Sequence, residues 1–205
     1  EDFMKVLTDD DSHVRQSVWK FTVFVVKAVQ DKEITANAID KLFNMLTPDY
    51  RLEWVMDCLA DIINVTQDKE IFKKALDKIL GLLTDDESEG YIKRRILKSV
   101  FEMVKGVKDD KQVTNRVLDK VMSLFSDDDE WVRKDARKFT VKIMKAAQDK
   151  NVNMETFDKI SGLLTDDNPG VIHVSLVALA KIAKNTGITT TQSLDKIINL
   201  LSHDN

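Results

Sequence analysis

The sequence has few of the residues that interrupt helices or cross-link chains. Its 205 residues include 6 Gly, 2 Pro and a single cysteine, Cys58. Two prolines are too few for most loop-rich all-β folds, and one cysteine cannot form an intramolecular disulfide. We therefore expect an ordered, helix-rich protein in a reducing, intracellular setting, most simply the cytoplasm.

Long apolar runs and an excess of positive charge are also lacking. No apolar span reaches roughly 18 residues and no signal-peptide pattern is present, so no membrane partner is expected. Lys and Arg number 31 against 35 Asp and Glu, which gives a net charge of −4. Nucleic-acid binding would therefore need a local basic patch. With 43% apolar and 32% charged residues, the chain can bury a core, which excludes a disordered protein.

A short signature recurs along the chain: an apolar residue, Thr or Ser, and an acidic pair or a close variant of it. The copies are spaced by 39, 37, 42, 39 and 37 residues, at 7–10, 46–49, 83–86, 125–128, 164–167 and 201–204. A stronger match lies at an offset of 118, where residues 8–49 share 19 identities in 42 positions with residues 126–167. This similarity indicates internal duplication.

Each unit has the pattern of two helices joined by a short polar turn. The first helix follows a cluster of capping residues and has apolar positions at helical spacing, for example Val132, Ala136, Phe139 and Ile143. The second contains an apolar-Asp-Lys-apolar motif at 39–42, 76–79, 118–121, 157–160 and 194–197. Because such a pair cannot bury its apolar face alone, neighbouring pairs must stack.

The predicted fold class is all-α, an α-α superhelix or solenoid forming a single domain over residues 1–205. It contains about five helical hairpins, and residues 1–7 form a partial helix that either caps the array or belongs to a preceding repeat. The predicted repeats span approximately 8–46, 47–83, 84–125, 126–164 and 165–203.

The repeat length, the acidic turns and the Asp-x-x-Val-Arg pattern at 11–15 and 129–133 resemble HEAT repeats. The resemblance covers nearly the whole chain. Ile92-Lys93 matches the Val-Arg part of the pattern more weakly, and Val171-Ile172 has no basic residue at the Arg position. The proline common in HEAT first helices is also missing. The resemblance implies that the second helices line a concave face.

The outward positions of the second helices carry a ladder of Asp, Lys and a small residue. If the resemblance holds, this ladder lines the groove and is the first candidate for partner binding. The alternative is that its opposite charges form ion pairs between neighbouring repeats, each worth about 0–1 kcal/mol. The candidate residues are Asp40, Lys41, Asn44, Asp77, Lys78, Asp119, Lys120, Asp158, Lys159, Asp195 and Lys196.

The outward positions of the first helices are basic instead. This basic ridge could bind phosphates, but it is also what any solvated helix face requires, and no stacking aromatics are expected between its lysines. Its residues are Lys20, Lys27, Arg94, Lys98, Lys105, Lys134, Arg137, Lys138, Lys142 and Lys145.

Three apolar residues of one first helix, Trp19, Val23 and Phe24, form a hypothetical sticky patch. Phe24 occupies a position where the aligned helices carry Glu102, Lys142 and Lys181. We expect the patch to contact a partner or a preceding repeat. The alternative is a flank buried against the neighbouring hairpin.

No catalytic or metal-binding pattern is recognisable. The three histidines are far apart and Cys58 lies in an apolar helical run, so no metal, cofactor or nucleophile is expected. The acidic turns lack the ligand spacing of a calcium loop and are expected to cap helices. The hypotheses, in order, are a non-catalytic scaffold that binds a protein or peptide, a nucleic-acid binder and a cryptic enzyme. Oligomeric state is left open.

Overall fold

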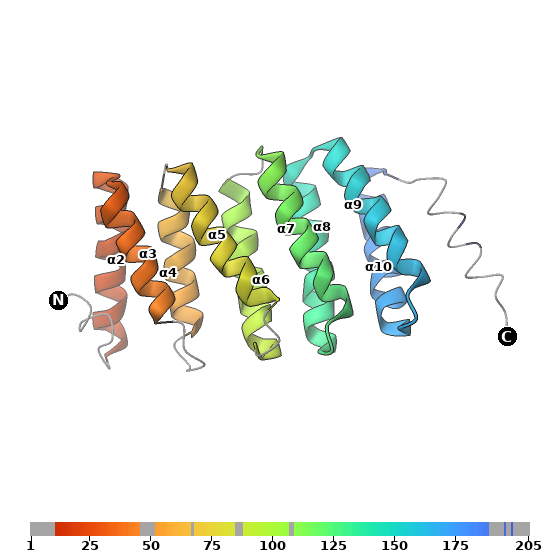
Figure 1. Cartoon of the computed structure of the whole chain (residues 1–205), viewed down its shortest axis with the longest axis horizontal. Coiled ribbons are helices and arrows are strands. Elements are labelled where there is room, and N and C mark those ends of the chain that lie inside the picture. Colours follow the sequence, from red (N-terminus) through yellow and green to blue (C-terminus); the bar gives the residue numbers. More distant parts are fainter. Residues whose placement is uncertain are drawn as a thin grey trace. The chain divides into compact units, whose positions relative to one another are not determined.

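The computed structural model describes residues 11–45, 52–66, 68–84, 88–106 and 109–188, together with residues 195 and 198. Over these residues every regular element is a helix, and no strand occurs among them. The predicted all-α solenoid is therefore confirmed (Figure 1). The partial helix at 1–7 and most of the last predicted second helix lie outside the described residues.

The helices alternate as first and second members of hairpins. The described part contains four hairpins and the first helix of a fifth. In chain order the elements are α2 (Ser12–Val29), α3 (Lys32–Asn44), α4 (Leu52–Val65), α5 (Lys69–Leu83), α6 (Gly90–Gly106), α7 (Lys111–Ser123), the 3-10 helix η1 (Leu124–Ser126), α8 (Glu130–Ala147), α9 (Lys150–Gly162), the 3-10 helix η2 (Leu163–Thr165) and α10 (Pro169–Thr186).

Acidic and amide side chains begin these helices. The carboxylate of Asp129 accepts hydrogen bonds from the backbone N–H groups of Trp131 and Val132, at 2.7 and 3.4 Å. Capping of this kind satisfies N–H groups that have no partner inside the helix. The same role is filled at other helix starts by Asp11, Asp31, Asp110, Asp149 and Asn168. The prediction that the acidic turns cap helices is confirmed at Asp11 and Asp129, whereas residues 85–87 of the turn before α6 lie outside the described residues.

Three first helices end on a residue with left-handed backbone geometry. Gln30 closes α2 with φ 52°, Gln148 closes α8 with φ 51°, and Gly187 closes α10 with φ 69°. The backbone N–H of each bonds back to the carbonyl four residues earlier. Glycine adopts this conformation without steric cost, whereas glutamine does not.

The chain divides into two compact units, residues 1–78 and 79–205, and the division falls within α5. In the first unit α2 packs on α3 and α4. In the second, α6, α8 and α10 pack side by side in one layer, and α7 and α9 in the other (Figure 1).

Each unit has a continuous apolar core. The first unit buries the inward face of α4, including Met56, Leu59 and Ile62. The second buries the apolar positions that the sequence predicts for α8, since Val132, Ala136 and Ile143 are fully enclosed. Each large apolar side chain buried in this way contributes about 1.5–3 kcal/mol.

Cys58 is part of the core of the first unit. The thiol is buried in α4, and burial raises its pKa well above the ordinary value, with smaller contributions from Asp61 and Asp57. A thiol that resists ionisation is a poor nucleophile. The expectation that Cys58 is a core residue is confirmed.

Candidate interaction surfaces

The Asp/Lys ladder of the second helices forms ion pairs between neighbouring hairpins. In the first unit Lys78 of α5 lies 2.6 Å from Asp40 of α3. In the second unit Lys159 of α9 lies 2.7 Å from Asp119 of α7. In both pairs the lysine belongs to the later repeat, so the motif joins successive hairpins. The side chains are largely exposed, and each pair therefore adds at most about 1 kcal/mol.

Lys159 has a second acidic neighbour. It lies 2.9 Å from Glu155, one turn earlier in α9. The hydrogen bonds that Lys159 donates, first to Asp119 and then to Glu155, raise the pKa of Lys159 above its ordinary value. Asp119 is thus neutralised by a lysine that stays charged throughout the physiological range.

The other ladder residues differ in environment. Lys41 and Asp77 are half-buried, whereas Asn44, Lys120, Asp158 and Asp195 are exposed. Lys196 lies outside the described residues.

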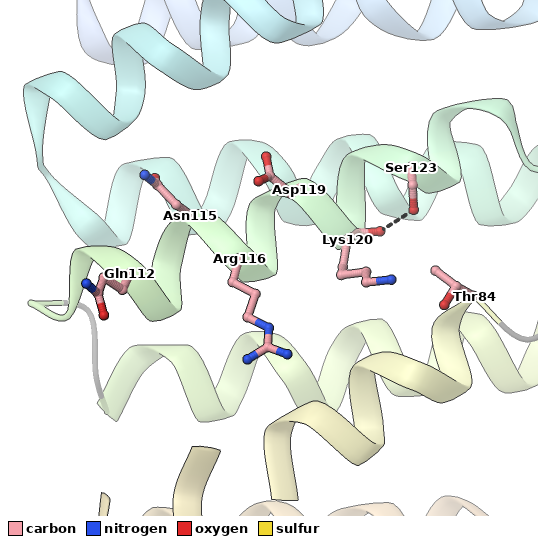
Figure 2. Close-up of a pocket in the computed structure, with 7 residues that line it drawn as sticks. All are labelled: Thr84, Gln112, Asn115, Arg116, Asp119, Lys120 and Ser123. Carbon is pink, nitrogen blue, oxygen red and sulfur yellow. Dashed lines mark hydrogen bonds between the residues drawn. The ribbon is translucent and has the colours of Figure 1, made fainter. Parts of the chain in front are cut away.

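An open groove with a volume of about 670 Å³ runs along α7. Figure 2 shows that Arg116 and Lys120 extend from α7 on the side of Thr84, while Asp119 points to the opposite side. The hydroxyl of Ser123 donates to the backbone carbonyl of Lys120 at 2.8 Å, which satisfies the serine within its own helix. The groove is lined by Thr84, Gln112, Asn115, Arg116, Asp119, Lys120 and Ser123.

A second set of ion pairs joins the starts of the second helices. Lys32 of α3 contacts Asp68, which precedes α5, at 2.8 Å, and Lys111 of α7 contacts Asp149, which precedes α9, at 2.7 Å. The hydrogen bond from Lys111 lowers the pKa of Asp149, aided by the N–H of Val152. The signal for these pairs is the Asp-Lys that recurs at the start of the four described second helices, at 31–32, 68–69, 110–111 and 149–150, and it was not among the sequence-based predictions.

Part of the basic ridge is neutralised by carboxylates on the same layer of helices. Arg94 contacts Asp135 at 2.8 Å, Lys105 contacts Glu102 at 2.7 Å, and Lys134 contacts Glu130 at 2.6 Å. The bond from Lys134 lowers the pKa of Glu130. Within the described residues, four ridge lysines of the second unit have no carboxylate partner, namely Lys98, Lys138, Lys142 and Lys145.

The remaining ridge residues are separated from this group or partly enclosed. Lys20 and Lys27 are exposed on α2 in the first unit. Arg137 is half-buried on α8, and its Nε is buried without a hydrogen-bond partner in the described part of the chain.

Aromatic rings lie between the ridge cations, so the expectation that none would do so is wrong. Phe101 of α6 and Phe139 of α8 have ring centroids 5.7 Å apart. The ammonium of Lys142 lies 5.1 Å from the Phe101 centroid and 5.2 Å from that of Phe139. The ammonium of Lys105 also lies over the Phe101 ring, 4.6 Å from its centroid. Because the two rings come from neighbouring helices, the spacing of residues along either helix alone does not show that the rings meet.

A third ring lies at the start of α8. Trp131 is 59% exposed, with Lys134 at 4.5 Å and Arg94 at 5.8 Å from its ring. An exposed ring held between two cations is a feature that the sequence analysis did not identify.

The predicted apolar patch on α2 is only partly exposed. Phe24 is 65% exposed, whereas Trp19 and Val23 are half-buried. Phe21, which the sequence analysis did not select, is 59% exposed. It lines an apolar groove of about 240 Å³ between α2 and α3, together with Thr22, Val25, Val26, Ile34, Asn37, Ala38 and Lys41.

In the described part of the chain, no group of three or more His, Cys, Asp or Glu side chains is placed to hold a metal ion. Over the same residues, no helix combines the length and the apolar character needed to cross a membrane.

Comparison with known proteins relates the second unit to a family of helical repeats. Residues 106–205 match the family model of the non-SMC mitotic condensation complex subunit 1. Because that family is of the HEAT type, the match confirms the HEAT-like character identified from the sequence. The crystal structure of an engineered protein from the Northeast Structural Genomics Consortium is 19% identical, with a TM-score of 0.43, and the alignment covers 89% of this chain and 98% of that one. No curated protein matches the chain.

Proposed function

We propose that this chain is a non-catalytic scaffold that binds an acidic, extended segment of a partner protein along α7. The observation that carries the proposal is the open groove beside Arg116 and Lys120. An open groove suits a peptide better than a small molecule, which needs a pocket that encloses most of its surface.

The charge distribution of the groove favours an acidic ligand. Asp119 is paired with Lys159 on the far side of α7, so its negative charge is already compensated. Lys120 has no ion pair with a carboxylate among the described residues. A partner carboxylate would therefore meet Lys120 without displacing an internal partner, and complementary charge would speed association.

The other ladder residues belong to the same proposal, but Lys78 and Lys159 differ from Lys120 because they already pair with Asp40 and Asp119. A longer partner would use Asp158 and Lys159, and the equivalent positions at Asp195 and Lys196. In the first unit the corresponding residues are Asp40, Lys41, Asn44, Asp77 and Lys78.

The family comparison supports a scaffold rather than an enzyme. The family matched by residues 106–205 is described as a subunit of a mitotic condensation complex, and a subunit acts with other proteins. We extend this role to the present chain as part of the proposal. An intracellular setting is part of the proposal, supported by a single cysteine that cannot form an intramolecular disulfide.

Fluorescence anisotropy with a labelled decapeptide of alternating Glu and Ser tests the groove. We expect saturable binding that Lys120→Glu weakens at least about tenfold, roughly 1.4 kcal/mol. The matched control is Lys138→Glu, which reverses an exposed lysine on the other layer and leaves the affinity unchanged. Equal weakening by the two variants would indicate attraction by overall charge alone and would contradict the proposal.

We infer a second candidate function, nucleic-acid binding, from the aromatic rings within the basic ridge. Lys142, which has no carboxylate partner among the described residues, lies beside the Phe101 ring, and Trp131 is 59% exposed, so the ridge combines charge with rings on which bases can stack. The affinity for single-stranded DNA should fall steeply as the salt concentration rises. Lys142→Glu should reduce the slope of log affinity against log salt concentration by about one. Affinity that does not change with salt excludes this function.

A further inference from the structure

Two cations lie one helical turn apart on the groove side of α7. Arg116 and Lys120 are both exposed, and Figure 2 shows that they extend from α7 on the side of Thr84. Like charges four residues apart in a helix repel each other and destabilise it. A ligand that neutralises both cations together also relieves this repulsion, so it gains more than a ligand that pairs with one of them.

The equivalent turn of α9 lacks this repulsion. At an offset of 39 residues, Lys120 corresponds to Lys159 and Arg116 corresponds to Glu155. Glu155 contacts Lys159 at 2.9 Å within α9, as expected for opposite charges one turn apart. In α7 an arginine takes the place of that glutamate, so no carboxylate lies one turn before Lys120.

The rest of the groove places hydrogen-bond donors near the two cations. Gln112, one turn earlier in α7, carries an amide, and Thr84 carries a hydroxyl that donates to the carbonyl of Gly81 at 3.3 Å. Asp119 is the one carboxylate among the described residues that line the groove, and it points to the opposite side (Figure 2). The groove side of α7 therefore combines positive charge with neutral donors.

We propose that the partner segment bound along α7 carries a phosphorylated serine or threonine, whose phosphate contacts Arg116 and Lys120 together. Such a phosphate carries about −1.5 to −2 charges at neutral pH and three acceptor oxygens, whereas a glutamate carries one charge. A planar guanidinium binds two phosphate oxygens at once, and an ammonium adds a point charge. Because a guanidinium has five N–H donors, it can bind phosphate while its other N–H groups keep their contacts. This inference rests on the proposed function and names the partner more closely.

A nucleic-acid strand also carries phosphate, but the groove suits it less. Each phosphodiester has a single charge, so one phosphodiester neutralises only one of the two cations. Bases of a single strand stack on aromatic rings, and no Phe, Tyr or Trp is among the described residues that line the groove. The exposed ring of Trp131 belongs to α8, in the other layer of helices. Charge and lining together therefore favour a phosphorylated peptide.

Fluorescence anisotropy with three labelled decapeptides tests for the phosphate. The first alternates Glu and Ser, and the other two have phosphoserine or serine in place of its central Glu. We expect the phosphoserine peptide to bind at least about tenfold more tightly than the glutamate peptide at a pH of about 7.5. The ratio of the two affinities should shrink as the pH falls to about 5.5, because the phosphate loses its second charge near a pKa of about 6.

Variants of the two cations separate a defined contact from attraction by overall charge. Arg116→Glu copies the arrangement of α9, where Glu155 occupies this position, and should remove the preference for phosphoserine over glutamate. Lys120→Gln, a milder change, should reduce the preference at least about threefold. The matched control is Lys138→Glu, which makes the same change of charge at an exposed residue of α8 and should preserve the preference.

The outcomes distinguish this inference from the proposed function. Equal affinities for the phosphoserine and glutamate peptides, with the glutamate peptide still weakened by Lys120→Glu, overturn the phosphate and leave the acidic partner segment standing. Absence of saturable binding by all three peptides overturns both. Binding of the phosphoserine peptide alone supports the inference and restricts the proposed function to a phosphorylated partner.

Two further results overturn the inference. One is an equal loss of the phosphoserine preference in Arg116→Glu and Lys138→Glu, because overall charge would then explain it. The other is displacement of the phosphoserine peptide by a single-stranded oligonucleotide of the same net charge at an equal concentration, which would make the groove a nucleic-acid site.

Discussion

Lys93 of α6 and Asp127, in the turn that follows η1, form the most enclosed ion pair described in the chain, at 2.9 Å with 13% and 9% of their side chains exposed. Asp127 also accepts the backbone N–H of Asp129 at 3.0 Å. Arg133 donates to the backbone carbonyls of Asp127 and Asp128. The pair therefore joins two successive hairpins at the turn that orients α8.

Replacing Lys93 with Met should destabilise the chain. The substitution keeps the length of the side chain but leaves the carboxylate of Asp127 enclosed without its cation, which costs roughly 1–3 kcal/mol. Urea unfolding followed by circular dichroism measures this loss. The matched control is Lys78→Met, which removes an exposed pair and should cost less than about 1 kcal/mol. An equal loss of unfolding free energy in the two variants would show that enclosing the Lys93–Asp127 pair does not increase its contribution to stability.

The left-handed helix ends offer a stabilising substitution. Gln148→Gly should stabilise the chain by up to about 1 kcal/mol, because glycine adopts a positive φ without steric cost and no side-chain hydrogen bond of Gln148 is present in the described structure. Thermal unfolding measures the effect.

Two neighbouring substitutions check the explanation. Gln30→Gly should gain less, since Gln30 donates to the backbone carbonyls of Lys27 and Val65, both at 3.0 Å. Gly187→Ala should lower stability by about 1 kcal/mol, because alanine is strained at this φ. A neutral result for Gly187→Ala would show that backbone strain at these ends is negligible.

Gly90 at the start of α6 is required by a close approach from the next hairpin. A Cβ at this position would lie 2.0 Å from Oδ2 of Asp129, the side chain that caps α8. Gly90→Ala should therefore displace the cap and cost about 1 kcal/mol. Gly81→Ala is the control, since a Cβ there meets no atom within 4 Å and removing glycine from α5 should stabilise by about 0.5–1 kcal/mol. If both substitutions stabilise the chain, the cap is not strained by Gly90→Ala.

The hairpins could be predicted from local pattern because their determinants are close in sequence. The turn at 30–32 contains the end of α2, the cap of α3 and its first residue, and the same local code recurs at 148–150. Contacts between repeats could not be read in this way. Phe101 and Phe139 lie 38 residues apart on different helices, and nothing in either helix shows that their rings meet.

The exposure of Phe21 was missed for a related reason. Its duplicate, Phe139, occupies an apolar position of α8, and the two residues have the same helical context. What differs is the neighbouring hairpin that covers one and not the other. Burial in a repeat array depends on which repeat stands next to a residue, and this information is absent from the residue's own helix.

The ion pair between Lys111 and Asp149 predicts a dependence of stability on acid. The folded-state pKa of Asp149 lies below its ordinary value of 3.8, first through the hydrogen bond from Lys111. The pair therefore contributes stability above the unfolded pKa, and this contribution is lost as the pH falls through the folded-state value. Lys111→Gln should raise the pKa of Asp149 towards 3.8 in a carbon-detected NMR titration. The rise should be incomplete, because the N–H groups of Val152 and Asn151 still donate. Lys150→Gln, next in sequence to the carboxylate, should leave the pKa in place, and an equal rise in both variants would mean that overall charge, and not the bond, sets the pKa.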